Sequence, residues 1–248
     1  MEHFISPLQQ RDLLGDAAAQ NRAFFAKLME RTLEHAFFAH AFLSAASDES
    51  PVSRELATLV LTGFYQVVEP FTGLLCSLAA KAPSLRSRFV LMDNLFEELG
   101  RGDFEAAHPR LYLSMLDSIG VSRHTAESAD RVPAIRRIQE HLAETVERQP
   151  FAVSCAVLAS AESIIPASFP VLARMAQRAC PCADMRFFDR HGVRDDGHAG
   201  DAATLFVIHA DPSQWRCAER EVTLHLDCRL QLLDVWMDLA TSTTDTRG

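Results

Sequence analysis

The chain has 248 residues and 48% of them are hydrophobic, which is enough to bury a substantial globular core. Its formal net charge is −9 and it has no basic cluster, so it lacks the positive face that nucleic-acid binding requires. The longest nearly apolar run, residues 56–68, is too short to span a bilayer. We therefore expect a globular protein that binds neither nucleic acid nor a membrane.

The first residues and the cysteines both indicate a cytoplasmic protein. The N-terminal stretch MEHFISPLQQRDLL lacks the basic segment and apolar run of a signal peptide. The six cysteines include no CxxC pair, and the CPC sequence at 180–182 is too tight for a zinc knuckle and gives poor disulfide geometry. We expect reduced thiols that are mostly buried.

Apolar residues recur at steps of three and four along almost the whole chain, which is the period of amphipathic helices. Ser50 and Pro51 resemble a helix N-cap and a first-turn proline, whereas Gly100–Asp103 interrupts the pattern and Thr125–Ala134 forms a polar connector. The predicted helices cover approximately residues 23–43, 51–80, 84–99, 104–116, 132–147, 151–166, 168–179, 184–208 and 212–240.

The remaining patterns favour a single domain. No short segment alternates between apolar and polar residues with turns on both sides, so we predict no strands. No linker or long repeat divides the chain. We predict one all-α domain over residues 1–248, a bundle of about seven to eight helices, with frayed ends at about 1–12 and 241–248.

The sequence HGVRDDGH places His191, Asp195 and His198 four and three residues apart, so in a helix all three lie on one face. Two phenylalanines precede this segment and the apolar stretch AATLFVI follows it, and a histidine in such surroundings needs a partner. The three residues are therefore candidate metal ligands. The alternative is a solvated polar stripe, since charged residues also stand at 190, 194 and 196.

Glu105 and His108 form a second candidate set, the Glu-x-x-His pair of di-iron helical proteins, although such pairs are also common on surfaces. Pro109 cannot lie deep inside a regular helix, so we expect the segment GRGDFEAAHP to bulge. A bulge would bring Glu98 beside His108, with Glu97 pointing elsewhere. The sequence leaves the choice between Glu98 and Glu105 open.

Glu162 lies in the most apolar helical stretch of the chain, where an acid is costly unless it is paired, hydrogen-bonded or bound to a cation. It is a candidate ligand; the alternatives are an acid near the proline bend that follows, or one satisfied by arginine. Glu69 is a weaker candidate because it precedes a proline and can simply mark a kink. His35 and His40 do not share a face, and we interpret them as ordinary helix residues.

Together these sets supply carboxylates and imidazoles from three separate helices. Hard carboxylate ligands mixed with histidine suit iron or manganese better than zinc. Six or seven ligands are too many for one metal ion and fit two.

This combination resembles the haem-oxygenase-like di-iron oxidases, also called iron-containing redox enzymes, which share the helical fold of haem oxygenase and the TenA thiaminases. The likeness covers about residues 61–210. Its most specific part is the His-x3-Asp-x2-His motif at 191–198, supported by the Glu/His helix and the isolated glutamate upstream of it. The segments FYQVVEPFTGLL and NLFEELGRGDFEAAHPRLYLSML also look like family segments. The resemblance implies a single TenA-like helical bundle.

The resemblance further implies two iron ions as cofactors, with manganese as an alternative metal, O2 as co-substrate and a place for an external electron donor. The ligands it implies are Glu98 or Glu105, His108, Glu162, His191, Asp195 and His198, with Glu69 or Glu98 as an extra carboxylate. Around them, pocket residues are expected among Phe64, Tyr65, Phe96, Phe187 and Phe188, with Arg101 or Arg194 holding a substrate carboxylate. Plain core packing is the alternative for each of these aromatic residues.

Members of this family oxidise different small molecules, and ligands alone cannot select among these reactions. We expect N-oxygenation, or another oxidation at carbon or nitrogen, of a small amine or amino acid in a biosynthetic pathway. The alternatives are oxidative decarboxylation of a fatty or other carboxylic acid, and a non-catalytic helical binding protein on the same scaffold. Haem is not expected, because nothing resembles the Gly-rich distal helix of haem oxygenase. A homodimer is the expected assembly.

Overall fold

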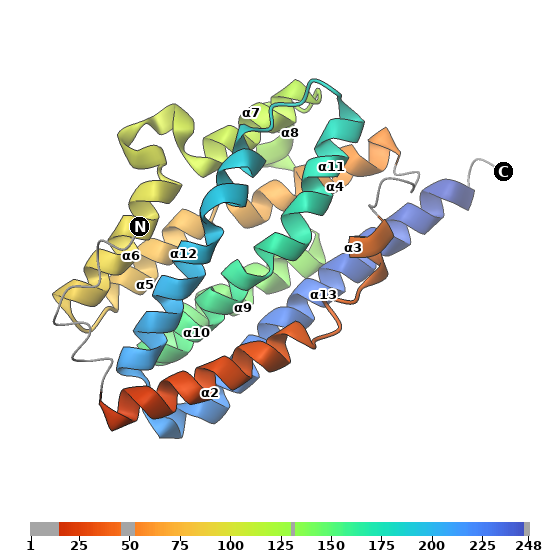
Figure 1. Cartoon of the computed structure of the whole chain (residues 1–248). Coiled ribbons are helices and arrows are strands. Elements are labelled where there is room, and N and C mark those ends of the chain that lie inside the picture. The colour runs from red at the N-terminus through yellow and green to blue at the C-terminus, as the bar shows by residue number, and fades with distance from the viewer. Residues whose placement is uncertain (1–14, 46–52, 130–131, 246–248) are drawn as a thin grey trace.

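The computed structural model describes residues 15–45, 53–129 and 132–245, apart from the side chains of 45, 192–196 and 243–245. Within these ranges the chain is helical and contains no strand, which confirms the all-α prediction (Figure 1). The α-helices are α2 (Asp16–Leu33), α3 (Ala41–Ala45), α4 (Arg54–Val68), α5 (Phe71–Ala80), α6 (Leu85–Glu98), α7 (His108–Ser118), α8 (Arg123–Ser128), α9 (Pro133–Arg148), α10 (Phe151–Ser163), α11 (Ile165–Ala179), α12 (Arg186–His209) and α13 (Trp215–Asp245). Three short 3₁₀ segments complete the order: η1 (Gly100–Gly102), η2 (Phe104–Ala106) and η3 (Pro212–Gln214).

The described residues thus form twelve α-helices, more than the seven to eight predicted. One reason is that the helix predicted over 51–80 is divided at Pro70, whose missing N–H ends the regular bonding of α4 and starts α5. A second is that the predicted connector contains α8, whose first turn is capped by the Ser122 hydroxyl. At the other end, α13 continues to Asp245 and so enters the tail that was expected to fray. The predicted fraying of residues 1–12 lies outside the described residues.

His35 and His40 are not ordinary helix residues, because the predicted helix over 23–43 is interrupted after Leu33. The Nδ1 atoms of the two histidines accept hydrogen bonds from the backbone N–H groups of Phe37 and Phe42, at 3.2 and 3.1 Å. Their Nε2 atoms each lie 3.2 Å from an aspartate on α13. The two rings therefore attach the turns between α2 and α3 to the last helix.

The core is organised around α10, in which every residue from Ala152 to Glu162 is buried. This helix packs against α12, α13, α9 and α11, so none of its sides faces solvent between Ala152 and Glu162. The helix α4 lies against α11 and α7 (Figure 1). A carboxylate on α10 is therefore placed among several layers of apolar side chains.

The residues of Arg54–Ala80 are, by length and composition alone, apolar enough to cross a membrane. In the structure 44% of their most apolar window is buried inside the protein, and core helices of globular proteins share this composition. The thiols are less buried than predicted, since only Cys155 and Cys228 of the six are in the buried class.

Asn21 links three helices through its side chain and is 1% exposed. Its amide donates to the carbonyls of Val207 and Ala210 at 3.0 and 2.7 Å, and its Oδ1 accepts from Trp215 Nε1 at 2.9 Å. It therefore satisfies polar groups where α12 ends and α13 begins.

We predict that Asn21→Ala lowers the free energy of unfolding by about 2–4 kcal/mol, because buried partners lose their hydrogen bonds. Urea unfolding followed by circular dichroism measures this change. The exposed Gln20 of the same helix gives a matched control, and Gln20→Ala should stay close to the parent protein. Equal effects of the two substitutions would contradict the role assigned to Asn21.

Candidate metal centre

The end of α6 and the start of α7 are joined by a left-handed turn. Gly100, Arg101 and Gly102 have φ values of 78°, 57° and 92°. A Cβ on Gly100 would lie 2.5 Å from the backbone nitrogen of Ala107, so only glycine fits this position. The turn folds the chain back sharply, and this brings Glu98, the last residue of α6, close to the first residue of α7.

The first residue of α7 is His108, and Pro109 occupies the first turn of this helix. A proline is well tolerated there because a first-turn N–H has no partner within the helix. The expected distortion therefore lies entirely before α7, in the turn and η2, and the helix itself is regular from its start.

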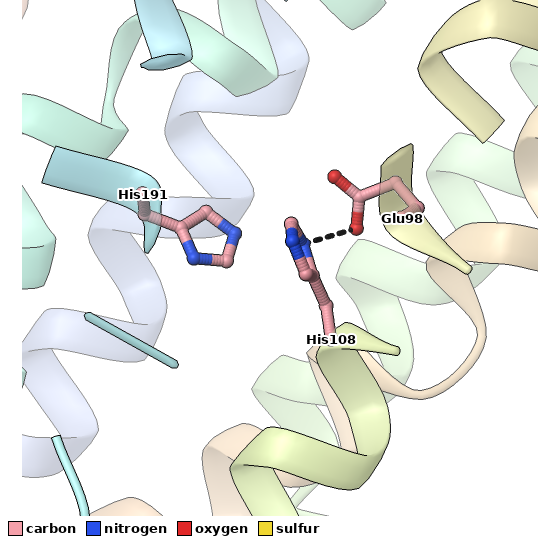
Figure 2. Close-up of side chains that lie close together, drawn as sticks. All are labelled: Glu98, His108 and His191. Atoms are coloured by element: carbon pink, nitrogen blue, oxygen red, sulfur yellow. Dashed lines mark ion pairs between the residues drawn. The ribbon is translucent and has the colours of Figure 1, made fainter. Parts of the chain in front are cut away.

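Three buried side chains from three helices meet at this point (Figure 2). The Nδ1 atom of His108 lies 2.7 Å from Oε2 of Glu98. The ring of His191, from α12, lies with its centroid 4.4 Å from that of His108. Each residue offers a ligand atom, and all three of these atoms lie within 4.8 Å of one another. The structure thus brings together one carboxylate and two imidazoles in a space that suits a metal ion.

The ring of His191 is fixed in one orientation. Its Nδ1 lies 2.8 Å from the carbonyl oxygen of Phe187 and donates to it, which leaves Nε2 as the basic nitrogen. The rings of Phe169 and Phe187 pack against it at centroid distances of 4.9 and 4.4 Å. A backbone carbonyl that fixes the tautomer of a histidine in this way is a common companion of metal ligands.

The protonation states of Glu98 and His191 also suit the binding of a metal cation. Burial alone would raise the pKa of Glu98, but its hydrogen bond to His108 and the charges of the surrounding histidines outweigh this and lower the pKa. Burial, together with the charge of His108, lowers the pKa of His191 to about 4. At neutral pH the carboxyl is ionised and this imidazole is neutral, which are the forms that bind metal.

His198, about two helical turns after His191 on α12, lies beside the same carboxylate. Its Nδ1 is 4.0 Å from Oε1 of Glu98, and its Nε2 is 3.0 Å from Oε2 of Glu97. Burial lowers the pKa of His198. The prediction that Glu97 points elsewhere is wrong, because Glu97 and Glu98 both lie near His198. Consecutive side chains on a helix diverge by about 100°, but α12 passes the end of α6 closely enough for His198 to approach both carboxylates.

Glu162, on α10, is 4% exposed and lines the same cavity as Glu98, His108 and His191. Asp195 and Arg194 lie on α12, but their side chains lie outside the described residues. The described residues that line this cavity are otherwise mostly apolar: Phe37, Phe64, Val67, Val68, Phe71, Ala161, Ile164, Ile165, Ser168, Phe169, Leu172, Phe187, Leu232, Leu233 and Trp236, together with Arg229.

Two of the predicted carboxylates do not join the site. Glu105 is exposed and forms an ion pair with Arg110 at 2.9 Å. Glu69 is exposed at the C-terminal end of α4. The structure therefore favours Glu98 over Glu105, because the turn carries Glu105 outward as it brings the two helix ends together.

The predicted pocket residues are only partly placed at the cavity. Phe64 and Phe187 line it, whereas Tyr65 stacks on Tyr112 and Phe188 packs against other phenylalanines in the core. Phe96 is 51% exposed on the surface of α6 and does not line this cavity.

Arg101, predicted to hold a substrate carboxylate, is exposed and forms an ion pair with Glu97. Prediction from the sequence missed Arg229 and Trp236 of α13, which do line the cavity. The apolar residues in LHLDCRLQLL are a weak signal for Arg229, because the same segment contains the charged Asp227 and so also resembles an amphipathic surface helix.

The chain belongs to the family of iron-containing redox enzymes, whose model matches residues 58–232. This confirms the family that the resemblance indicated. No curated protein sequence matches the chain.

Solved structures with the same fold cover nearly the whole chain. A CADD-like protein of unknown function from Nostoc punctiforme is 15% identical, with a TM-score of 0.69, and the match covers 88% of this chain and 97% of that one. A TenA homologue from Pseudomonas syringae is 16% identical, with a TM-score of 0.67 and coverage of 90% and 93%. A domain of unknown function with a haem-oxygenase-like fold from Shewanella denitrificans is 16% identical, with a TM-score of 0.65 and coverage of 89% and 91%. The haem-oxygenase-like bundle is thereby confirmed as the fold.

The two rival glutamates provide a direct test of the metal centre. We predict that Glu98→Ala lowers Fe(II) affinity by about ten-fold or more, since it removes the ionised ligand from the cluster. Glu105→Ala is the matched control and should bind iron like the parent, because Glu105 is exposed and paired with Arg110. Anaerobic equilibrium dialysis measures both. Loss of iron in Glu105→Ala with retention in Glu98→Ala would reverse the assignment.

The metal-free protein should lose stability as the pH falls. The pKa of His191 is about 4 in the folded protein against an ordinary 6.5, so between these values only the unfolded chain takes up a proton there. The lowered pKa of Glu98 acts in the same direction at lower pH. The free energy of unfolding is therefore expected to fall from about pH 6.5 towards about pH 4.

Urea unfolding at about pH 7 and about pH 5 measures this dependence. His191→Gln should show a weaker pH dependence than the parent, and His124→Gln, at an exposed position of α8, should leave it unchanged. Stability that rises as the medium becomes more acidic would contradict the environment described for His191.

Proposed function

We propose that this protein is a non-haem di-iron enzyme that activates O2 to oxidise a small amine or amino acid. One observation carries the proposal: in a chain of the iron-containing redox family, Glu98, His108 and His191 offer ligand atoms within 4.8 Å of one another. A mixture of carboxylate and imidazole ligands is typical of iron sites, whereas structural zinc sites are typically built from thiolates.

The surroundings of Glu98 support a second iron. Its Oε2 faces His108 and its Oε1 lies 4.0 Å from His198, so one carboxylate stands between two imidazoles from different helices. Glu162 lines the same cavity and would supply a further oxygen ligand. In this proposal Glu98, His108, Glu162, His191 and His198 would hold the iron, and Asp195, which lies on α12, would be an additional ligand as the resemblance implies.

Iron bound at this site would supply the transfer of electrons to O2, which protein side chains cannot perform. The chain contributes position and environment. Glu98 offers its negative charge in a place with little water, and the hydrogen bond to Phe187 directs the basic nitrogen of His191. The aromatic lining excludes water from the reacting molecules.

The substrate is a small molecule that enters this lined cavity. The mainly aromatic and aliphatic lining also favours the second candidate, oxidative decarboxylation of a fatty or other carboxylic acid. An external electron donor, a homodimer and a cytoplasmic location remain predictions from the sequence, as does the absence of nucleic-acid and membrane partners.

We predict that anaerobic loading with Fe(II) gives about two iron ions per chain and that admission of O2 then produces a transient visible absorbance. His198→Ala and Glu162→Ala should each lose iron and turnover while keeping the helical circular dichroism spectrum. Glu69→Ala is the control, because this exposed carboxylate lies at the end of α4.

A screen of amines, amino acids and fatty acids with Fe(II) and O2, followed by mass spectrometry, identifies the reaction. A protein that binds no iron and remains colourless would favour the non-catalytic binding protein. A Soret band from tightly bound haem, or one iron per chain, would overturn the di-iron proposal.

A further inference from the structure

Arg229 is a buried arginine inside the cavity that contains the metal ligands. It lies on α13, is 8% exposed and lines this cavity together with Glu98, His108, Glu162 and His191. Among the described lining residues it is the only arginine or lysine. It also lines a neighbouring cavity between α5 and α9, so it stands where the two spaces meet.

The guanidinium has few partners for a group with five N–H donors. Over the described part of the chain its one hydrogen bond runs from Nε to Nε2 of His225, at 3.4 Å, and no carboxylate lies within ion-pair distance. Burial first, and then the charge of Arg229, lowers the pKa of His225 well below its ordinary value, so this imidazole is neutral and cannot balance the charge. Donor capacity is left for a ligand.

Arg229 itself remains charged. Burial lowers its pKa to about 10, and the neighbouring Cys228 and Glu162 oppose that effect. A group with this pKa carries its proton at neutral pH. A buried cation is costly unless an anion meets it, and a guanidinium binds a carboxylate through two parallel hydrogen bonds.

The other residues that line the cavity indicate the chemical character of the part of the ligand that does not bind Arg229. Phe64, Phe71, Ile164 and Trp236 present aromatic and aliphatic surface in the same cavity as the charged group. A molecule that satisfies both features has one carboxylate and an apolar body. With its carboxylate on Arg229, its other atoms lie along the same cavity as Glu98 and the two histidines.

We propose that Arg229 binds the carboxylate of the substrate and so orients an apolar carboxylic acid or apolar amino acid towards the metal ligands. This deepens the proposed function and rests on it for the identification of the ligand as a substrate. An amine without a carboxylate would leave the cavity's guanidinium unmatched. Within the reactions considered above, the inference selects those whose substrate is an acid.

The test measures binding to the metal-free protein by isothermal titration calorimetry, so that it does not depend on turnover. The probes are octanoate, leucine and phenylalanine, each compared with its primary amide, in which the carboxylate charge alone is removed. We expect the carboxylate to bind about ten-fold or more tightly than the amide for at least one pair. In Arg229→Gln this preference should fall to about one, and in Arg229→Lys part of it should return. Arg137→Gln, at an exposed position of α9, should keep the full preference.

The outcomes separate the possible roles of Arg229. If Arg229→Gln loses stability but keeps the preference for carboxylate, the residue is structural and the proposal is wrong. If Arg229→Gln fails to fold, the parent and Arg229→Lys decide, and a parent that does not distinguish acid from amide overturns the proposal. Tighter binding of octyl phosphate than of octanoate would show that Arg229 prefers a phosphate to a carboxylate, and this would contradict the assignment.

Two further results distinguish this proposal from the proposed function. Loss of the di-iron assignment, with the carboxylate preference intact, would leave an acid-binding protein. Iron-dependent oxidation of an amine that has no carboxylate, without any preference for acids, would support the enzyme and exclude the role of Arg229.

Discussion

The structure depends on keeping an ionised carboxylate, Glu98, inside an apolar bundle. The free energy cost of burying such a group is large unless opposite charge or hydrogen bonds surround it. Two helices meet this requirement: His108 of α7 and His198 of α12 face its two oxygens, and His191, also of α12, lies within the same cluster. Because His191 and His198 come from a distant part of the chain, the electrostatic requirement of Glu98 holds α12 against the ends of α6 and α7.

A second charged group lies on another wall of the same cavity. Arg229 of α13 and Glu162 of α10 interact electrostatically, and both are buried. Between them and the imidazoles the lining is aromatic and aliphatic, so charge is concentrated at few points. The cavity therefore contains both candidate metal ligands and a fixed cation. These charged residues are held by different core helices, so their combination is a property of the fold.

The helical fold could be predicted because the apolar period of three to four residues repeats over the whole chain. That His191 and His198 share one face of a helix could also be predicted, because it follows from regular helix geometry. The choice of Glu98 over Glu105 could not. It depends on three consecutive residues with positive φ, beginning at Gly100, and a non-glycine residue in this conformation, Arg101, carries no clear sequence signal.

Arg229 was missed for a different reason. An arginine within a long amphipathic helix resembles a surface residue unless its neighbours are placed in three dimensions. The positions of His35 and His40 show the same limit: their side chains bind backbone N–H groups in turns where periodicity predicted continuous helix. Periodicity predicts which segments are helical, but the ends of helices depend on particular side-chain contacts.

The short turn at Gly100–Gly102 divides the metal site into a local half and a distant half. Glu98 and His108 are joined by a brief loop, so little chain entropy opposes their approach. His191 arrives from a helix far along the sequence, and its approach requires α12 to dock on the rest of the bundle. Complete assembly of the three ligands therefore requires α12 to pack against α6 and α7, and retention of metal reports that this packing has formed.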